Sequence, residues 1–155
     1  MKKKYNKFNK THASNSLPVW NLTDLYSSIS SKKISIDLSY IVKLSKLFAK
    51  KYEGKIVKLN SKALINAILD LEKIDEKMDK ILSYAHLLVA EDADHEKNKI
   101  FFQQMQEKIT NYSSLLIFFT LELNQIDEKK LNTLLRNNKL NEYSIFFLRF
   151  DLILK

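Results

Sequence analysis

The chain has 155 residues, and its apolar content of 45% is enough to bury the core of a single domain. It contains one Gly, one Pro and no Cys. This composition excludes Gly-rich phosphate loops, disulfides and thiolate metal sites, and it leaves too few turn residues for a sheet of many strands. The net charge is +8, but only two of the 26 basic residues are Arg. Because proteins that recognise nucleic-acid bases favour Arg, the excess of Lys is only weak evidence for nucleic-acid binding.

These features predict an all-α fold, an antiparallel bundle of four to five helices, two of them long. Residues 1–16 carry five Lys in the first ten positions and little apolar surface, so we expect a disordered basic tail ahead of a helical domain over 17–155. The tail lacks the apolar run of a secretion signal, and the longest uncharged apolar-rich window, 109–121, is too short to span a membrane. We therefore predict a cytoplasmic protein.

The segment after Pro18 is predicted to pack onto the helices through an apolar cluster, followed by a loop over 27–35. The members of the cluster are Trp20, Leu22, Leu25 and Tyr26. The first helix is predicted to begin near Asp37, whose carboxylate can cap free backbone N–H groups. It should end at Gly54, because Gly adopts the left-handed C-cap conformation without strain.

The second helix is predicted to start at Asn60 or Ser61 and to end in the polar run 91–94. Its apolar residues recur at helical spacing and should form one buried stripe. The stripe consists of Leu64, Ile68, Leu71, Met78, Ile81, Ala85 and Leu88.

The third helix is predicted to run from Asp94, acting as its cap, to Asn124, a length of about 45 Å at 1.5 Å per residue. Its second half, 115–121, is apolar around most of the helix, which predicts burial on nearly every side. The main stripe consists of Phe101, Met105, Ile109, Tyr112, Leu116, Phe119 and Leu123.

A short fourth helix is predicted from Asp127 and should stop at Asn137 and Asn138. The residues that follow, from Leu140 to Leu154, are again strongly apolar and predict another helix, which is unfinished where the chain ends.

The segment His95-Glu96-Lys97-Asn98-Lys99 is half of a His-Glu-x-x-His zinc motif. Zinc needs a second imidazole one helical turn after the first, and a protonated Lys99 cannot take that role. We therefore interpret His95 as an exposed residue at a helix start. His12 lies in the predicted tail, and His86, with no second ligand at helical spacing, is interpreted as a partly buried packing residue.

Glu122 lies within an apolar run, where an unpaired carboxylate would be costly to bury. It could face solvent or pair with a Lys or Arg across the core, and a structural salt bridge is favoured over catalysis. The acidic run Glu91, Asp92 and Asp94 lacks the spacing of a calcium loop and is interpreted as a solvated helix junction. The sequence therefore assigns no catalytic, cofactor-binding or metal-binding residue in this chain.

Four segments in order resemble the N-terminal helical region of oligoendopeptidase F, an M3-family zinc metallopeptidase. They are Leu17-Pro-Val-Trp20 followed by Leu22, Asp24, Leu25 and Tyr26; Tyr52-Glu-Gly-Lys-Ile56 followed by Leu59; Ser83-Tyr-Ala-His-Leu-Leu88 with Asp92; and Phe118-Phe-Thr-Leu-Glu-Leu-Asn124 followed by Leu140 and Tyr143. The resemblance runs from about Leu17 to the end.

The resemblance implies helices on one side of a deep channel that admits short peptides. In the full-length family, zinc and a His-Glu-x-x-His helix lie far downstream, and no catalytic or zinc residue of the family maps onto this chain. We therefore expect an N-terminal fragment that is truncated before the catalytic domain and is inactive alone. Its end within an apolar helix is expected for a split or prematurely terminated reading frame, or for a piece of a longer protein.

Two alternatives remain open. The chain could be a subunit that complements a separately encoded catalytic remainder, because apolar residues 115–121 and the unfinished helix 140–154 predict a large exposed apolar patch. It could instead be a Lys-rich helical interaction module that binds nucleic acid or anionic membrane through residues 2–10, which ranks below the other two.

Overall fold

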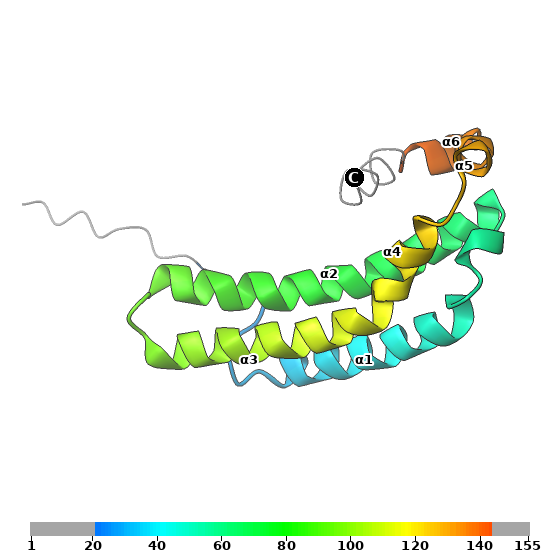
Figure 1. Ribbon diagram of the computed structural model, residues 1–155. Helices are drawn as coiled ribbons and strands as arrows, with labels where there is room; N and C mark the ends of the chain where they lie inside the picture. The colour runs from blue at the N-terminus through cyan, green and yellow to red at the C-terminus, as the bar shows by residue number, and fades with distance from the viewer. Residues whose placement is uncertain (1–20, 144–155) are drawn as a thin grey trace, which may run out of the picture.

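The structure is a computed structural model that describes residues 21–143, and in that range it contains helices and turns without a strand (Figure 1). The predicted all-α class is therefore confirmed. Three helices are long: α1 (Lys32–Tyr52), α2 (Ser61–Glu91) and α3 (Glu96–Ser113). The shorter elements are η1 (Ile56–Lys58), η2 (Ser114–Leu116), α4 (Ile117–Leu123), α5 (Glu128–Leu135) and α6 (Asn138–Asn141), of which η1 and η2 are 3₁₀ helices.

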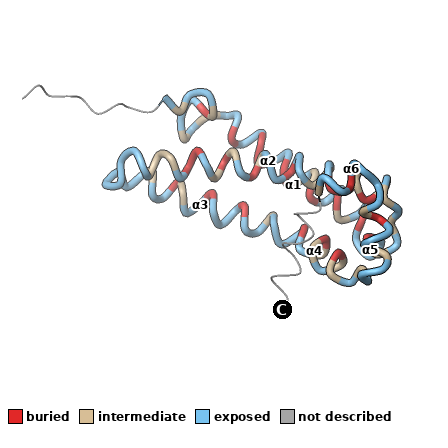
Figure 2. The backbone as a smooth tube through the Cα atoms, turned by 90° about the horizontal axis from the view of Figure 1, so that it is seen from above, coloured by how far each residue is buried: buried red, intermediate tan, exposed pale blue. Residues whose placement is uncertain are grey.

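The helices α1, α2 and α3 lie side by side and alternate in direction, and each packs against the other two (Figure 1). Figure 2 shows buried positions recurring along these helices with exposed positions between them. The elements α5 and α6 lie near the start of α2, where the hydroxyl of Ser61 donates to the carbonyl of Leu134 at 3.2 Å. None of the helices described in residues 21–143 combines the length and apolarity needed to cross a membrane.

The first helix begins five residues before its predicted start. Ser31 is the N-cap of α1, and its hydroxyl accepts a hydrogen bond from the N–H of Lys33. Asp37 is instead a buried residue inside α1, because its carboxylate is held by Tyr26 and Lys77 from other parts of the fold. The predicted end is confirmed, since Gly54 follows the helix with a φ of +73°.

The predicted start of the second helix is confirmed, because the side chain of Asn60 accepts a hydrogen bond from the N–H of Ala63. The helix then runs unbroken to Glu91. Its predicted stripe faces the core: five of its members are buried, and Leu71 and Leu88 are partly buried.

The third predicted helix is broken into three elements. It starts at Glu96 with His95 as the N-cap, so the prediction of Asp94 as its cap is wrong. The α-helix ends at Ser113, where the chain passes through η2 into α4. At the break, the hydroxyls of Ser113 and Ser114 donate to the carbonyls of Ile109 and Asn111, a type of bond that bends helices.

The prediction that residues 115–121 are buried on nearly every side is also wrong. Leu116 and Phe119 belong to the buried core, but Leu115, Ile117 and Leu121 are exposed. The exposed fraction of Ile117 reaches 61%. The α4 segment therefore packs by one face and leaves the other apolar face to solvent.

The last described elements follow two caps that the sequence contains. The carboxylate of Asp127 accepts from the N–H of Lys130 and starts α5, as predicted. Asn137 lies just after the end of α5, as predicted. Its side chain also caps the short α6 by accepting a hydrogen bond from the N–H of Lys139.

Several predictions concern residues beyond the described range. The disordered tail over 1–16, Pro18, Trp20 and most of the apolar helix predicted over 140–154 lie outside residues 21–143. The described part of the apolar cluster is confirmed, because Tyr26 is buried and both Leu22 and Leu25 pack against the core.

Candidate functional site

An open groove of about 670 Å³ runs along α1 and α2. We call it the α1–α2 groove. It is lined by Tyr40, Leu44, Leu47, Phe48, Lys50, Lys51, Asp70, Lys73 and Ile74. Its floor is formed by the buried side chains of Phe48 and Ile74, and its rim includes Tyr40 and Leu47, of which 45% and 51% are exposed. Apolar surface thus continues from the core to the outside of the molecule.

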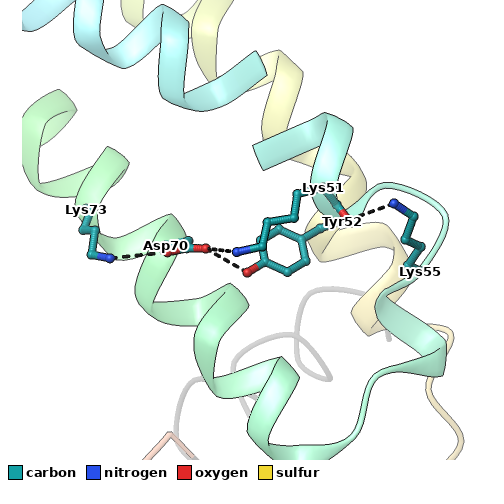
Figure 3. Close-up of polar contacts among 5 residues, drawn as sticks. All are labelled: Lys51, Tyr52, Lys55, Asp70 and Lys73. Atoms are coloured by element: carbon teal, nitrogen blue, oxygen red, sulfur yellow. Dashed lines mark hydrogen bonds and ion pairs between the residues drawn. The ribbon is translucent and has the colours of Figure 1, made fainter. Parts of the chain in front are cut away.

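One end of the groove carries a polar cluster around Asp70 (Figure 3). Its carboxylate accepts hydrogen bonds from Lys51 Nζ and Tyr52 Oη, each at 2.8 Å, and from Lys73 Nζ at 3.3 Å. Burial alone would raise the pKa of Asp70, but these three donors outweigh it and lower that pKa. The hydrogen bond to Asp70 also raises the pKa of Lys51, so both groups remain charged at neutral pH.

The cluster ties the end of α1 to α2. Lys55 Nζ adds a hydrogen bond to the carbonyl of Lys51 at 2.9 Å, on the last turn of α1 (Figure 3). Both lysines that pair with Asp70 are mostly exposed, so water screens the ion pairs and each contributes little to stability. The cluster therefore positions charges at the groove more than it stabilises the fold.

A second polar cluster joins the segment before α1 to α1 and α2. The hydroxyl of the buried Tyr26 donates to Asp37 at 2.8 Å, and Lys77 Nζ donates to the other carboxylate oxygen at 3.1 Å. Burial would raise the pKa of Asp37, but the hydrogen bonds from Tyr26 and Lys77 outweigh it, so that this pKa lies below its ordinary value. Burial and the bond to Asp37 raise the pKa of Tyr26, which remains a neutral donor.

Glu122 binds backbone N–H groups at the turn after α1. One carboxylate oxygen accepts from the N–H of Gly54 at 2.6 Å and the other from the N–H of Ile56 at 3.0 Å. The side chain is partly buried. Within residues 21–143 it forms no salt bridge with a Lys or Arg, and its described partners are backbone N–H groups, which the sequence did not indicate.

The described histidines do not come together. His95 is exposed at the N-terminus of α3, as predicted. His86 is exposed, not partly buried, and its ring packs edge-on against Phe102 with the centroids 6.0 Å apart. His12 lies outside the described residues.

The acidic junction at Glu91, Asp92 and Asp94 is exposed, as predicted. Within residues 21–143, no three His, Cys, Asp or Glu side chains gather as ligands for a metal ion. Lys99, also exposed, occupies the place where a zinc helix would need its second imidazole.

The α1–α2 groove was not predicted from the sequence, although a signal for it exists. Ile36, Tyr40 and Leu47 recur at helical spacing on a face of α1 opposite to the one that enters the core. An apolar row of this kind, outside the main stripe, marks a second face that needs a partner.

The comparisons with known proteins give no identity for this fold. No family model, no curated protein and no solved structure matches the chain. The α1–α2 groove places exposed apolar surface, Tyr40 and Leu47, beside the lysines Lys50, Lys51 and Lys73.

Proposed function

We propose that this chain is the N-terminal helical part of an oligoendopeptidase F-type zinc oligopeptidase. It has no hydrolytic activity of its own and docks onto a separately encoded catalytic part. The observation that carries the docking is the α1–α2 groove, where the exposed rim residues Tyr40 and Leu47 adjoin the core residue Phe48. An apolar surface that continues from the core to solvent is typical of a protein–protein interface whose partner is not bound.

The resemblance gains support from a contact between two of its segments. Glu122 belongs to the segment Phe118–Asn124, and its carboxylate binds the backbone of Gly54 and Ile56, which belong to the segment Tyr52–Ile56. The two segments thus depend on each other structurally although they lie far apart in sequence. This dependence is expected if they form one inherited unit.

Inactivity is tested with the purified chain, a short fluorogenic peptide and added zinc. We expect no cleavage above the rate in buffer, because hydrolysis by this class needs a metal-bound water. A mock preparation from cells that lack the chain identifies contaminating peptidases. Reproducible turnover that co-purifies with the chain and disappears with the chelator would show that the chain is itself a peptidase.

Docking is tested by co-expressing the chain with a separately encoded polypeptide that carries a His-Glu-x-x-His helix. We expect the two to co-purify and to cleave the peptide together. Leu47→Asp, which places a charge at the groove, should reduce both co-purification and activity. Ile100→Asp is the matched control, because Ile100 is a similarly exposed apolar residue that does not line the groove. If the two wild-type chains fail to associate, the proposal is wrong.

A further inference from the structure

One face of α1 combines exposed apolar residues with unopposed positive charge. Ile36, Tyr40, Lys43, Leu47 and Lys50 are separated by four, three, four and three residues, which places them on a single face of the helix. All five are exposed, and Tyr40, Leu47 and Lys50 line the α1–α2 groove. We call this set the basic ridge.

No carboxylate of the described residues neutralises the basic ridge. The single acidic residue of α1 is Asp37, which is buried and bonded to Tyr26 and Lys77. Across the groove, Asp70 is already bonded to Lys51 and Lys73. Within residues 21–143, neither Lys43 nor Lys50 takes part in a salt bridge. The rim of the groove therefore carries an excess of positive charge beside apolar surface.

We infer that the groove binds an amphipathic helix of the partner polypeptide, with apolar residues facing Tyr40 and Leu47 and carboxylates facing Lys43 and Lys50. The inference rests on the proposed function, in which this groove is the docking surface. Two antiparallel helices offer a groove in which a third helix packs by its apolar face. The α1 residues that line the groove run from Tyr40 to Lys51, about 17 Å at 1.5 Å per residue, which corresponds to about three turns of the bound helix.

A flat anionic membrane is a poorer fit for the same surface. The groove is concave, and its apolar floor, Phe48 and Ile74, lies buried beneath the rim, where a planar surface cannot reach it. A helix inserts side chains into such a hollow and also brings acids to the rim.

The probe is a synthetic helical peptide of 18 residues with Leu at helical spacing and Glu on both sides of the Leu stripe. A twin peptide has Lys in place of Glu, and a scrambled peptide keeps the composition but loses the stripe. Fluorescence anisotropy measures the dissociation constant at low salt. We expect saturable binding of the Glu peptide, with backbone NMR shifts concentrated in α1 and α2, and at least tenfold weaker binding of the other two.

The matched variants separate specific contacts from net charge. Lys43→Glu with Lys50→Glu reverses the ridge charges and should weaken binding about tenfold, since both attractive charge pairs become repulsive. Lys129→Glu with Lys139→Glu changes the net charge equally at exposed positions on α5 and α6 and should leave binding within about twofold. Circular dichroism verifies that both variants are folded.

The inference is overturned if the scrambled peptide binds as tightly as the Glu peptide, or if both double variants weaken binding equally. It is also overturned if the chain does not bind the Glu peptide but binds vesicles of phosphatidylcholine and phosphatidylglycerol. Co-purification of the wild-type chain with the catalytic part, unaffected by ridge reversal, would refute this inference while supporting the proposed function. Peptide binding without any such association would support a groove that prefers an acidic amphipathic helix, and it would refute the proposed catalytic partner.

Discussion

The helix α2 and the region 96–123 look alike in sequence, but only α2 folds as one continuous helix. Both regions carry apolar residues at helical spacing over about four heptads, and the structure keeps α2 unbroken for 31 residues. The second region ends its α-helix at Ser113 and resumes as α4 at Ile117. Residues 115–121, next to the break, are more apolar than α2, which is unbroken. Hydrophobicity therefore does not determine helix continuity here.

The difference lies in what each region must contact. The helix α2 meets α1 and α3 along its length and requires no change of direction. After the break, α4 places Phe119 against Phe48, with the ring centroids 5.6 Å apart, and brings Glu122 to the turn at Gly54. The hydroxyl bonds of Ser113 and Ser114 favour the bend locally. Local pattern fixes where helices can form, whereas distant contacts decide where they bend.

The largest effect is expected from removing the aromatic ring that holds α4 in place. Phe119 is fully buried, so Phe119→Ala should lower the free energy of unfolding by about 4 kcal/mol. Leu121, two residues away, is 53% exposed, and Leu121→Ala should change it by less than about 0.5 kcal/mol. Urea unfolding followed by circular dichroism measures both. Equal losses would mean that α4 is buried on all sides, as its sequence indicated.

The second effect concerns the polar cluster that α1 and α2 share with Tyr26. Asp37→Asn should cost about 2–3 kcal/mol, because it removes the charge that Lys77 neutralises and weakens the bond from the buried tyrosine. Tyr26→Phe, which keeps the ring, should cost less. If Asp37→Asn is as stable as the wild type, the cluster does not contribute to the free energy of unfolding.

The same residue should make stability depend on pH. The pKa of Asp37 is lower in the folded chain than its ordinary value, so the unfolded chain binds a proton more readily. Its contribution is therefore complete above the unfolded pKa of about 4 and is lost as pH falls through the folded pKa. Urea unfolding between pH 7 and pH 3 should show a smaller loss for Asp37→Asn than for the wild type. Identical pH profiles would exclude this role.

Some features that depend on neighbours in sequence were predictable, although the predicted caps Asp37 and Asp94 were wrong. Asn60 and Asp127 were correctly placed at helix starts, and Gly54 at the end of α1, because caps act on backbone groups within one helical turn. The roles of Asp37 and Glu122 were not predictable. Lys77 lies 40 residues from Asp37, and Gly54 lies 68 residues from Glu122. The groove escaped prediction for the same reason, since it exists only where α1 meets α2.

The third effect tests the bond that connects α4 to the end of α1. Glu122→Gln keeps the shape of the side chain but replaces one acceptor oxygen with an NH₂ group, which faces a backbone N–H. The free energy of unfolding should fall by about 2 kcal/mol, because charged acceptors contribute more than neutral ones. Glu107→Gln on the exposed face of α3 is the control and should be neutral. If Glu122→Gln and Glu107→Gln lower the free energy of unfolding equally, the contact of Glu122 with the turn contributes no more than an exposed surface interaction.

The smallest effect separates backbone strain from crowding at the same turn. Gly54 has a φ of +73°, and a methyl group added there would meet no atom within 4 Å. Gly54→Ala should therefore cost about 1 kcal/mol through conformation alone. Asn tolerates positive φ better than Ala although it is larger, so Gly54→Asn should cost less than Gly54→Ala. Urea unfolding of the two variants gives the order, and a larger cost for Asn would show that space, and not backbone conformation, requires glycine at this position.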